Sequence, residues 1–318
     1  MAQILVVGDA NPDLVLTGDV VPRFGQAEQL LDRAELLLGG SAAIVACGLA
    51  RLGVSTALAA VLGGDHFGDL VVARLDERGV ERSAVSVRAH EPTGLSVILD
   101  QGHDRAILTR LGTIPLLDAA QIREAVTRLR PAHVHVASYF LQPVLAAELP
   151  DLLRWLRLQQ TTVSLDTNWD PDERWLGLGD VLPLVDLILP NQAEERAIAG
   201  ALGVRSLTEL GPRVVIKCGA EGAESHGPDG SVTRAAGLSI DVADATGAGD
   251  SFDAGYLAAR AHGVLDESVR LRWGTVAGSL STRDAGGTAA QPTLETLRRW
   301  LPDVDREVSS QQGSRDVY

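Results

Sequence analysis

The sequence predicts an α/β fold with a doubly wound, mostly parallel sheet covered by helices on both faces. Short apolar runs that look like buried strands alternate with amphipathic helical patterns, as in the series 133–139, 148–160 and 161–168. This alternation is typical of a parallel sheet flanked by helices. Two hairpin-like stretches, 11–38 and 93–111, interrupt the alternation, and we expect them to pair into a small β-sheet lid.

The expected elements follow one another in a regular order. A strand at 4–7 is followed by the lid stretch 11–38 and then by a Gly-Gly turn and a helix of small residues that Gly53 closes. The further expected strands are 55–63, 133–139, 161–168, 185–191 and the pair within 213–227, and the further expected helices are 65–78, 117–130, 148–160, 193–201, the run after Asp250, and 267–283. The 318 residues suffice for one large domain with a small appendage. The expected division is an α/β core over 1–10, 39–92 and 112–305, a lid over 11–38 and 93–111, and a polar tail over 306–318.

Composition and charge exclude several classes of function. The formal net charge is −14, so the overall field opposes binding to nucleic acid or to an anionic membrane. The first residues show no leader pattern and the apolar runs are too short to span a bilayer, from which we expect a cytoplasmic protein. The two cysteines lie in no metal-binding spacing. Lys217 is the only lysine and is followed by Cys218, which excludes a Walker P-loop.

The stretch VADATGAGDSFDAGYLAA, residues 242–259, is the strongest candidate site. A turn of Gly247, Ala248 and Gly249 leads into a helical pattern, which gathers unpaired amides and the positive end of the helix dipole at one point. Such a turn binds anions, because glycines allow close approach to the backbone. Asp250 follows directly. A carboxylate there serves either as a base for a nucleophile that attacks a phosphate or as an ordinary helix cap, and both interpretations stay open.

Four motifs resemble those of the ribokinase-like (PfkB) family of carbohydrate kinases. DATGAGDSF at 244–252 is similar to the family signature D-T-x-G-A-G-D-x-F, and GGSAAIVACGLARLG at 39–53 is similar to G-G-x-x-x-N-x-A-x-x-L-A-R-L-G. GDANPDLVL at 8–16 and PNQAEE at 190–195 also match, in the right order along the chain. The resemblance implies a ribokinase-like fold whose core binds ATP and whose lid closes over a small sugar or sugar acid, to which the γ-phosphate is transferred.

The resemblance assigns the site residue by residue. It implies Asp250 as the catalytic base, with an anion hole formed by Gly247, Ala248 and Gly249. The residues implied for the sugar are Asp13, Gly39, Gly40, Ser41 and Arg110. The residues implied for the nucleotide are Asn191, Lys217, Gly219, Gly222 and Thr246. Asn191 and Glu194 are expected to organise Mg²⁺ through waters, and Asp244 with Thr246 and the loop 283–287 are expected to bind a monovalent cation such as K⁺.

Several of these residues have a plainer interpretation that the sequence does not exclude. Asn191 and Glu194 suit a helix N-terminus, Asp244 suits a turn, and Lys217 suits a solvated surface position. Asp166 and Asn168 follow an expected strand, at the edge where ligands of such sheets bind. The sequence leaves open whether they line the site.

Two departures from the family pattern put the substrate in doubt. Ser41 and Ile44 stand where the family often has asparagine, so one polar contact to the sugar is lost at Ile44. Arg110 falls where 2-keto-3-deoxygluconate kinases and fructokinases carry an arginine, and it pairs with a sugar carboxylate or is simply a solvated strand residue. With only Arg105 and Arg110 as arginines in the lid segment 93–111, an unphosphorylated acceptor is favoured. The alternatives are a nucleoside kinase and a non-catalytic sugar sensor. Since the lid often forms the dimer interface in this family, we also expect a homodimer.

Overall fold

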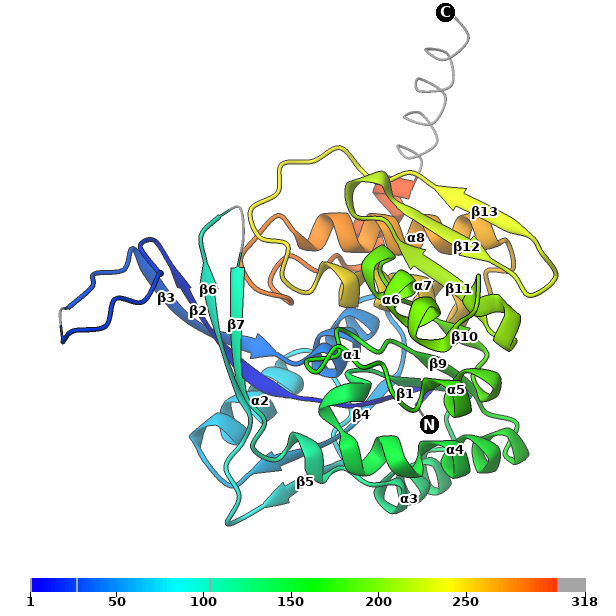
Figure 1. The fold of residues 1–318 in the computed structure, drawn as a ribbon, viewed down its shortest axis with the longest axis horizontal. Coiled ribbons are helices and arrows are strands. Elements are labelled where there is room, and N and C mark those ends of the chain that lie inside the picture. Colours follow the sequence, from blue (N-terminus) through cyan, green and yellow to red (C-terminus); the bar gives the residue numbers. More distant parts are fainter. Residues whose placement is uncertain (1, 27, 103–104, 302–318) are drawn as a thin grey trace, which may run out of the picture.

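The computed structural model describes residues 2–26, 28–102 and 105–301. Within these residues, a nine-stranded sheet has the order β13-β12-β11-β10-β9-β8-β1-β4-β5 (Figure 1). Its strands are β1 (Ile4–Val7), β4 (Thr56–Gly63), β5 (Val85–Arg88), β8 (His133–Val136), β9 (Thr162–Leu165), β10 (Leu187–Ile188), β11 (Arg213–Lys217), β12 (Ala223–His226) and β13 (Val232–Ala235). The pairs from β5 to β11 are parallel. The predicted fold class is therefore confirmed.

The winding of the sheet fixes where a ligand can bind. From β1 the chain continues to β4 and β5 on one side and later returns to β8 and the following strands on the other side. The crevice at the carboxyl ends of β1 and β8 is the usual ligand position in such a sheet. Two edge features were not predicted: β5, and β13, which pairs antiparallel with β12. Each of these strands has only four residues, which is too short for a clear alternation of apolar and polar side chains.

Helices cover both faces of the large sheet. The first layer consists of α1 (Ser41–Arg51), α2 (His66–Glu77), α7 (Ala248–Ala261) and α8 (Glu267–Ser281), and the second of α3 (Ala119–Leu129), α4 (Pro143–Leu158), α5 (Leu178–Val181) and α6 (Gln192–Leu202). Alternate residues of β1 enter the two cores, Ile4 and Val6 facing the first layer and Leu5 and Val7 the second. Helix α4 begins at Pro143, earlier than expected, because proline suits the first helical turn.

A smaller sheet projects from one side of the large one (Figure 1). It has the order β3-β2-β6-β7 and consists of β2 (Asn11–Thr17), β3 (Arg33–Gly39), β6 (Leu95–Asp100) and β7 (Arg105–Arg110). Both expected hairpins contribute, joined by parallel pairing of β2 with β6. Gly39, which the expected boundary assigned to the core, is the last residue of β3. The expected tail, 306–318, lies outside the described residues.

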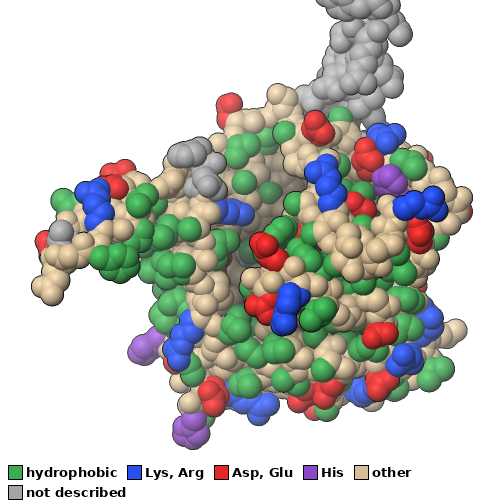
Figure 2. All heavy atoms as spheres, in the orientation of Figure 1, with side chains coloured by type: hydrophobic (Ala, Val, Ile, Leu, Met, Phe, Trp, Pro, Cys, Tyr) green, Lys and Arg blue, Asp and Glu red, His purple; other side chains and the backbone are tan. Residues whose placement is uncertain are grey.

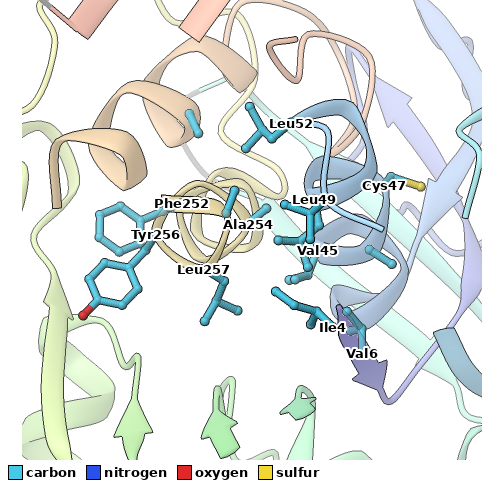
Figure 3. Packing of buried hydrophobic residues seen from close by; sticks show 14 of the residues in the cluster. Ile4, Val6, Val45, Cys47, Leu49, Leu52, Phe252, Ala254, Tyr256 and Leu257 are labelled. Atoms are coloured by element: carbon cyan, nitrogen blue, oxygen red, sulfur yellow. The ribbon is translucent and has the colours of Figure 1, made fainter. Parts of the chain in front are cut away.

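Small residues bring α1, α7 and α8 close together. Val45 and Leu49 of α1 face Ala254 and Leu257 of α7 (Figure 3). A Cβ on Gly48 would lie 2.7 Å from the Cβ of Ala254. A Cβ on Gly255 would lie 2.5 Å from the backbone oxygen of Trp273 in α8, closer than real Cβ atoms approach. Helix α7 is thus held tightly between its two neighbours, and its N-terminus is fixed relative to that of α1.

No helix in the described part of the chain is long and apolar enough to cross a membrane.

We predict that Gly255→Ala destabilises the protein by about 1–3 kcal/mol, the usual cost of overpacking. Gly200→Ala in α6 is the matched control, because nothing lies within 4 Å of its added Cβ. That control should gain about 0.5–1 kcal/mol, since alanine favours helix over glycine. Urea unfolding of both variants measures the difference, and equal stabilities would contradict this packing.

Candidate active site

The turn for which we predicted anion binding lies at the N-terminus of α7, and it is called the anion-binding turn below. Its N-cap is Gly247, which has φ 69° and offers no side chain to the helix amides. A Cβ at this position would lie 2.6 Å from the Cα of Gly287, so glycine is required for space as well as for conformation. The amide of Ala248 donates to the Ala245 carbonyl at 3.3 Å, so the amides of Gly249 and Asp250 are the ones that point, with the helix dipole, at a place that an anion can reach.

Asp250 lies in the first turn of α7 and does not cap the helix. The capping interpretation is therefore wrong. Its carboxylate instead accepts a hydrogen bond from the Oγ of Ser41 in α1, at 2.5 Å from Oδ1. Burial raises the pKa of Asp250 to about 7, and the Ser41 hydroxyl opposes that rise. The carboxyl group can thus exchange a proton near neutral pH.

Asp9, which the sequence analysis did not single out, fixes the N-terminus of α1. The N-cap of this helix is Gly40, with φ 83° and no side chain. The carboxylate of Asp9 accepts hydrogen bonds from the amides of Ser41 (3.1 Å) and Ala42 (3.0 Å) in its place. Burial raises the pKa of Asp9. The sequence did hold a signal for this role. An acid closely follows a buried strand, and a helix later in the chain begins without a capping side chain.

Asp13 and Gly39 meet across the base of the small sheet. A Cβ on Gly39 would lie about 2.0–2.2 Å from the Asp13 carboxyl atoms, so the carboxyl group occupies the space that glycine leaves. Asn11 Nδ2 donates to Asp13 Oδ1 at 3.0 Å. Burial, together with the nearby Asp9, raises the pKa of Asp13 to about 7. This end of the site is rich in buried acceptors, which suits a ligand with several hydroxyl groups.

The two arginines of β7 lie on opposite faces of the small sheet. Thr109 faces Ser96, with 3.1 Å between their hydroxyl oxygens, and Ser96 is the neighbour of Asp13 in the sheet register. Because side chains alternate along a strand, Arg105 shares this face and Arg110 faces away from Asp13. Arg105 Nη1 donates to Thr246 Oγ1 at 2.7 Å, two residues from Asp244 and next to the anion-binding turn. The structure therefore brings Arg105, and not Arg110, to the site.

A cavity of about 480 Å³ opens beside the anion-binding turn. Its lining includes the expected nucleotide residues Lys217, Gly219 and Gly222, together with Gly249. The opposite wall is apolar, with Leu238, Ile240, Val242 and Phe252. Figure 2 shows the surface hollowed where the small sheet meets the core.

Lys217 is mostly buried and paired with acids, so the solvated-lysine interpretation is wrong. Its side chain is 12% exposed, and Nζ lies 2.6 Å from Oδ2 of Asp166. It also lies 3.3 Å from Oδ2 of Asp253, one helical turn after Asp250. Asp166 therefore belongs to this cluster at the carboxyl ends of the strands. Asp253 was missed, because in the sequence it resembles an exposed helix residue.

Asn191 and Glu194 form a capping box at the start of α6. Asn191 Oδ1 accepts from the amides of Ala193 and Glu194, and Glu194 Oε2 accepts from the amide of Asn191. The Asn191 oxygen is thus committed to the helix, and within the described residues no group of three or more His, Cys, Asp or Glu could hold a metal ion. Burial and the charge of Asp166 raise the pKa of Glu194 to about 6. Asn191 and Glu194 therefore fit a divalent ion that is held through its water molecules, rather than one bound directly.

Asp244 joins two loops next to the anion-binding turn. Its Oδ1 accepts from the amide of Thr246 and its Oδ2 from the amide of Gly286, both at 2.8 Å. This is the turn-stabilising role that the sequence allowed. Ile44 packs at the same place, with its side chain against Gly247 and Gly287. An apolar contact therefore stands where the family pattern often has an asparagine.

Comparison with known proteins agrees with this geometry. An ATP-dependent ribose-1-phosphate kinase from Halopiger xanaduensis is 29% identical over 311 residues, covering 95% of this chain and 99% of that protein. A 2-dehydro-3-deoxygluconokinase from Bacillus subtilis is 27% identical over 300 residues, covering 87% and 90%. An E. coli crystal structure described as a putative ribokinase II, in complex with ATP and Mg²⁺, superposes with a TM-score of 0.81 at 21% identity, covering 95% of this chain and 100% of that chain. The model of the pfkB family carbohydrate kinases matches residues 1–294, and the chain therefore belongs to that family.

Proposed function

We propose that this protein transfers the γ-phosphoryl group of ATP to a hydroxyl of a small sugar acid or sugar, with Asp250 as the base. The observation that carries the proposal is the position of Asp250. It lies in the first turn of α7, between the anion-binding turn and the hydroxyl-accepting end formed by Asp9 and Asp13. A carboxylate next to an anion site is unfavourable for binding alone, but it is useful when a proton must leave the attacking hydroxyl.

The chemistry follows from the contacts of Asp250. The acceptor oxygen attacks the γ-phosphorus, its proton passes to the Asp250 carboxylate, and the bond to the β-phosphate oxygen breaks to release ADP. The Ser41 hydroxyl holds the carboxylate in place and favours its ionised form. The amides of Gly249 and Asp250 face the charge that develops on the transferred group, while the amide of Ala248 donates to the Ala245 carbonyl.

ATP arrives with Mg²⁺, which neutralises phosphate charge when it is bound. Glu194 and Asp166 are the acids that would hold its waters, and Asn191 orients Glu194 through the capping box. The nucleotide is placed in the cavity lined by Gly219 and Gly222, with the apolar wall available for the base.

The small sheet acts as the lid in this proposal. The Arg105–Thr246 hydrogen bond joins it to the loop before the anion-binding turn, so closure would shield the site from water. The Asp244 bonds keep that loop in place, and K⁺ binding here remains a proposal. An ATP-consuming reaction fits the cytoplasm expected from the sequence.

Arg105 favours an acceptor that carries a negative charge. A guanidinium forms paired hydrogen bonds with carboxylate or phosphate, and this one lies close enough to Asp13 to lower its pKa. The two curated relatives named above are, by their names, kinases of a sugar phosphate and of a sugar acid. One arginine on the site face of β7 supports a single carboxylate more readily than a phosphate, which usually needs a stronger basic pocket.

A nucleoside acceptor is the second candidate. Ile107 lies on the same face of β7 as Arg105 and is 54% exposed, which offers apolar surface to a base. The acidic end at Asp9 and Asp13 would suit a ribose in either case.

The outer face of the small sheet supports the expected homodimer. Leu36 and Leu108 lie on the face opposite Asp13 and are 36% and 59% exposed. We propose that a second copy covers them, which the molar mass from light scattering checks.

We expect ADP release above the ATPase background with one class in a panel of sugar acids, neutral sugars, sugar phosphates and nucleosides. The assay contains Mg²⁺-ATP and is run in KCl and in choline chloride, which tests K⁺ at the same time. A sugar acid is expected to be the best acceptor. Silence across the panel from folded, ATP-binding protein would overturn the proposal.

We predict that Arg105→Gln lowers kcat/KM for an anionic acceptor about tenfold to a hundredfold relative to a neutral one, the usual effect of losing a hydrogen bond to a charged group. Arg110→Gln on the opposite face is the matched control and should leave this ratio unchanged. The ratio is measured by ADP release with both acceptors. An equal effect of the two substitutions would show that Arg105 does not recognise the negatively charged group of the acceptor.

A further inference from the structure

The only lysine of the chain lies, mostly buried, beside the anion-binding turn. Lys217 is the last residue of β11, and its side chain lines the nucleotide cavity. Its Nζ lies 3.5 Å from the position that a Cβ on Gly249 would occupy. A phosphate that sits on the amides of this turn would therefore lie next to the ammonium group.

The two carboxylates that hold the ammonium group are unequal partners. Asp166 is close, at 2.6 Å, whereas the two Asp253 oxygens are 3.3 and 3.4 Å away. Both acids are almost fully buried, at 2% and 0% side-chain exposure. The strong contact comes from the sheet and the weak one from α7, the helix whose N-terminus forms the anion-binding turn.

A buried ion cluster of this kind needs a reason besides stability. Burying charges costs desolvation energy that their attraction often fails to recover, and apolar replacements are frequently as stable. The cluster lies at the wall of the nucleotide cavity, beside Gly249. A function in binding phosphate accounts for this position.

We propose that Asp253 is the positioning residue for Lys217, the lysine that the resemblance assigns to the nucleotide, and that Asp166 holds its ammonium group beside the anion-binding turn. When a triphosphate binds, the ammonium group keeps Asp166 and exchanges its weak contact with Asp253 for a phosphate oxygen at Gly249. This inference rests on ATP as the phosphoryl donor.

The test compares the double variant Lys217→Met/Asp253→Asn with the wild-type protein. The double substitution removes the ammonium group and one of its two acids, and the new side-chain amide at position 253 can still donate a hydrogen bond to Asp166. Calorimetry measures the affinities of a non-hydrolysable ATP analogue and of AMP in the presence of Mg²⁺. Arg213→Met, which breaks the Arg213–Glu267 pair at the other end of β11, is the matched control.

We expect the analogue to lose at least about tenfold in affinity relative to AMP in the double variant, as for a lost charged hydrogen bond. The control should leave the ratio of the two affinities unchanged. We also expect kcat to fall about a hundredfold. Lys217→Arg, which keeps the charge, should restore part of both. If the double variant instead keeps the wild-type affinity ratio and kcat within about tenfold, Lys217 is only a counter-ion and the proposal is wrong.

A second readout covers a double variant that fails to fold. Asp253→Asn alone keeps the lysine but removes the acid that aims it, and it should lower kcat with little change in AMP affinity. Unchanged kcat there would remove Asp253 from the proposal. Because the affinity ratio needs no turnover, it remains informative even if the acceptor panel is silent.

Discussion

The close approach of α1, α7 and α8 is the constraint on which the site depends. The bond between Ser41 and Asp250 joins the first turns of two helices that are distant in sequence. It forms only if the two helices lie closer than ordinary side chains permit, and Gly48 and Ala254 provide that spacing. Gly255 does the same between α7 and α8. The small residues along α1 and α7 are therefore required by packing before they are required by chemistry.

A second constraint is the placement of negative charge. Asp9, Asp13, Asp166 and Asp253 are buried, and Asp250 is half-buried, near the carboxyl ends of the central strands. Their surroundings are not all alike. Asp9 binds helix amides, Asp166 binds the lysine, and burial raises the pKa values of Asp13 and Asp250 to about 7. A site with this many acids attracts hydroxyl donors and hydrated cations, and it needs the helix dipoles and Lys217 to accept a polyphosphate.

The sequence predicted the parts of this site that depend on local backbone. Gly247 and Gly40 adopt positive φ at helix starts, and their glycine-rich turns are visible in the sequence. Contacts between distant segments were harder to predict. Arg110 looked equivalent to Arg105 until the register of β6 with β7 placed them on opposite faces. Asp253 and Lys217 are 36 residues apart, and only the meeting of α7 with β11 shows that they pair. Asp9 caps a helix that begins 32 residues later, which no local pattern reveals.

The central claim is that the Asp250 carboxylate removes the acceptor's proton. The most direct test is the kcat of Asp250→Asn beside that of the wild-type protein across pH, with acceptor affinity measured by calorimetry. The base must be ionised, and its pKa is raised to about 7, so wild-type kcat should fall as the pH drops below that value. The variant should bind the acceptor and lose kcat by about 10²- to 10⁴-fold, without the acid-side fall. A variant that keeps kcat within about tenfold of the wild type would contradict the account.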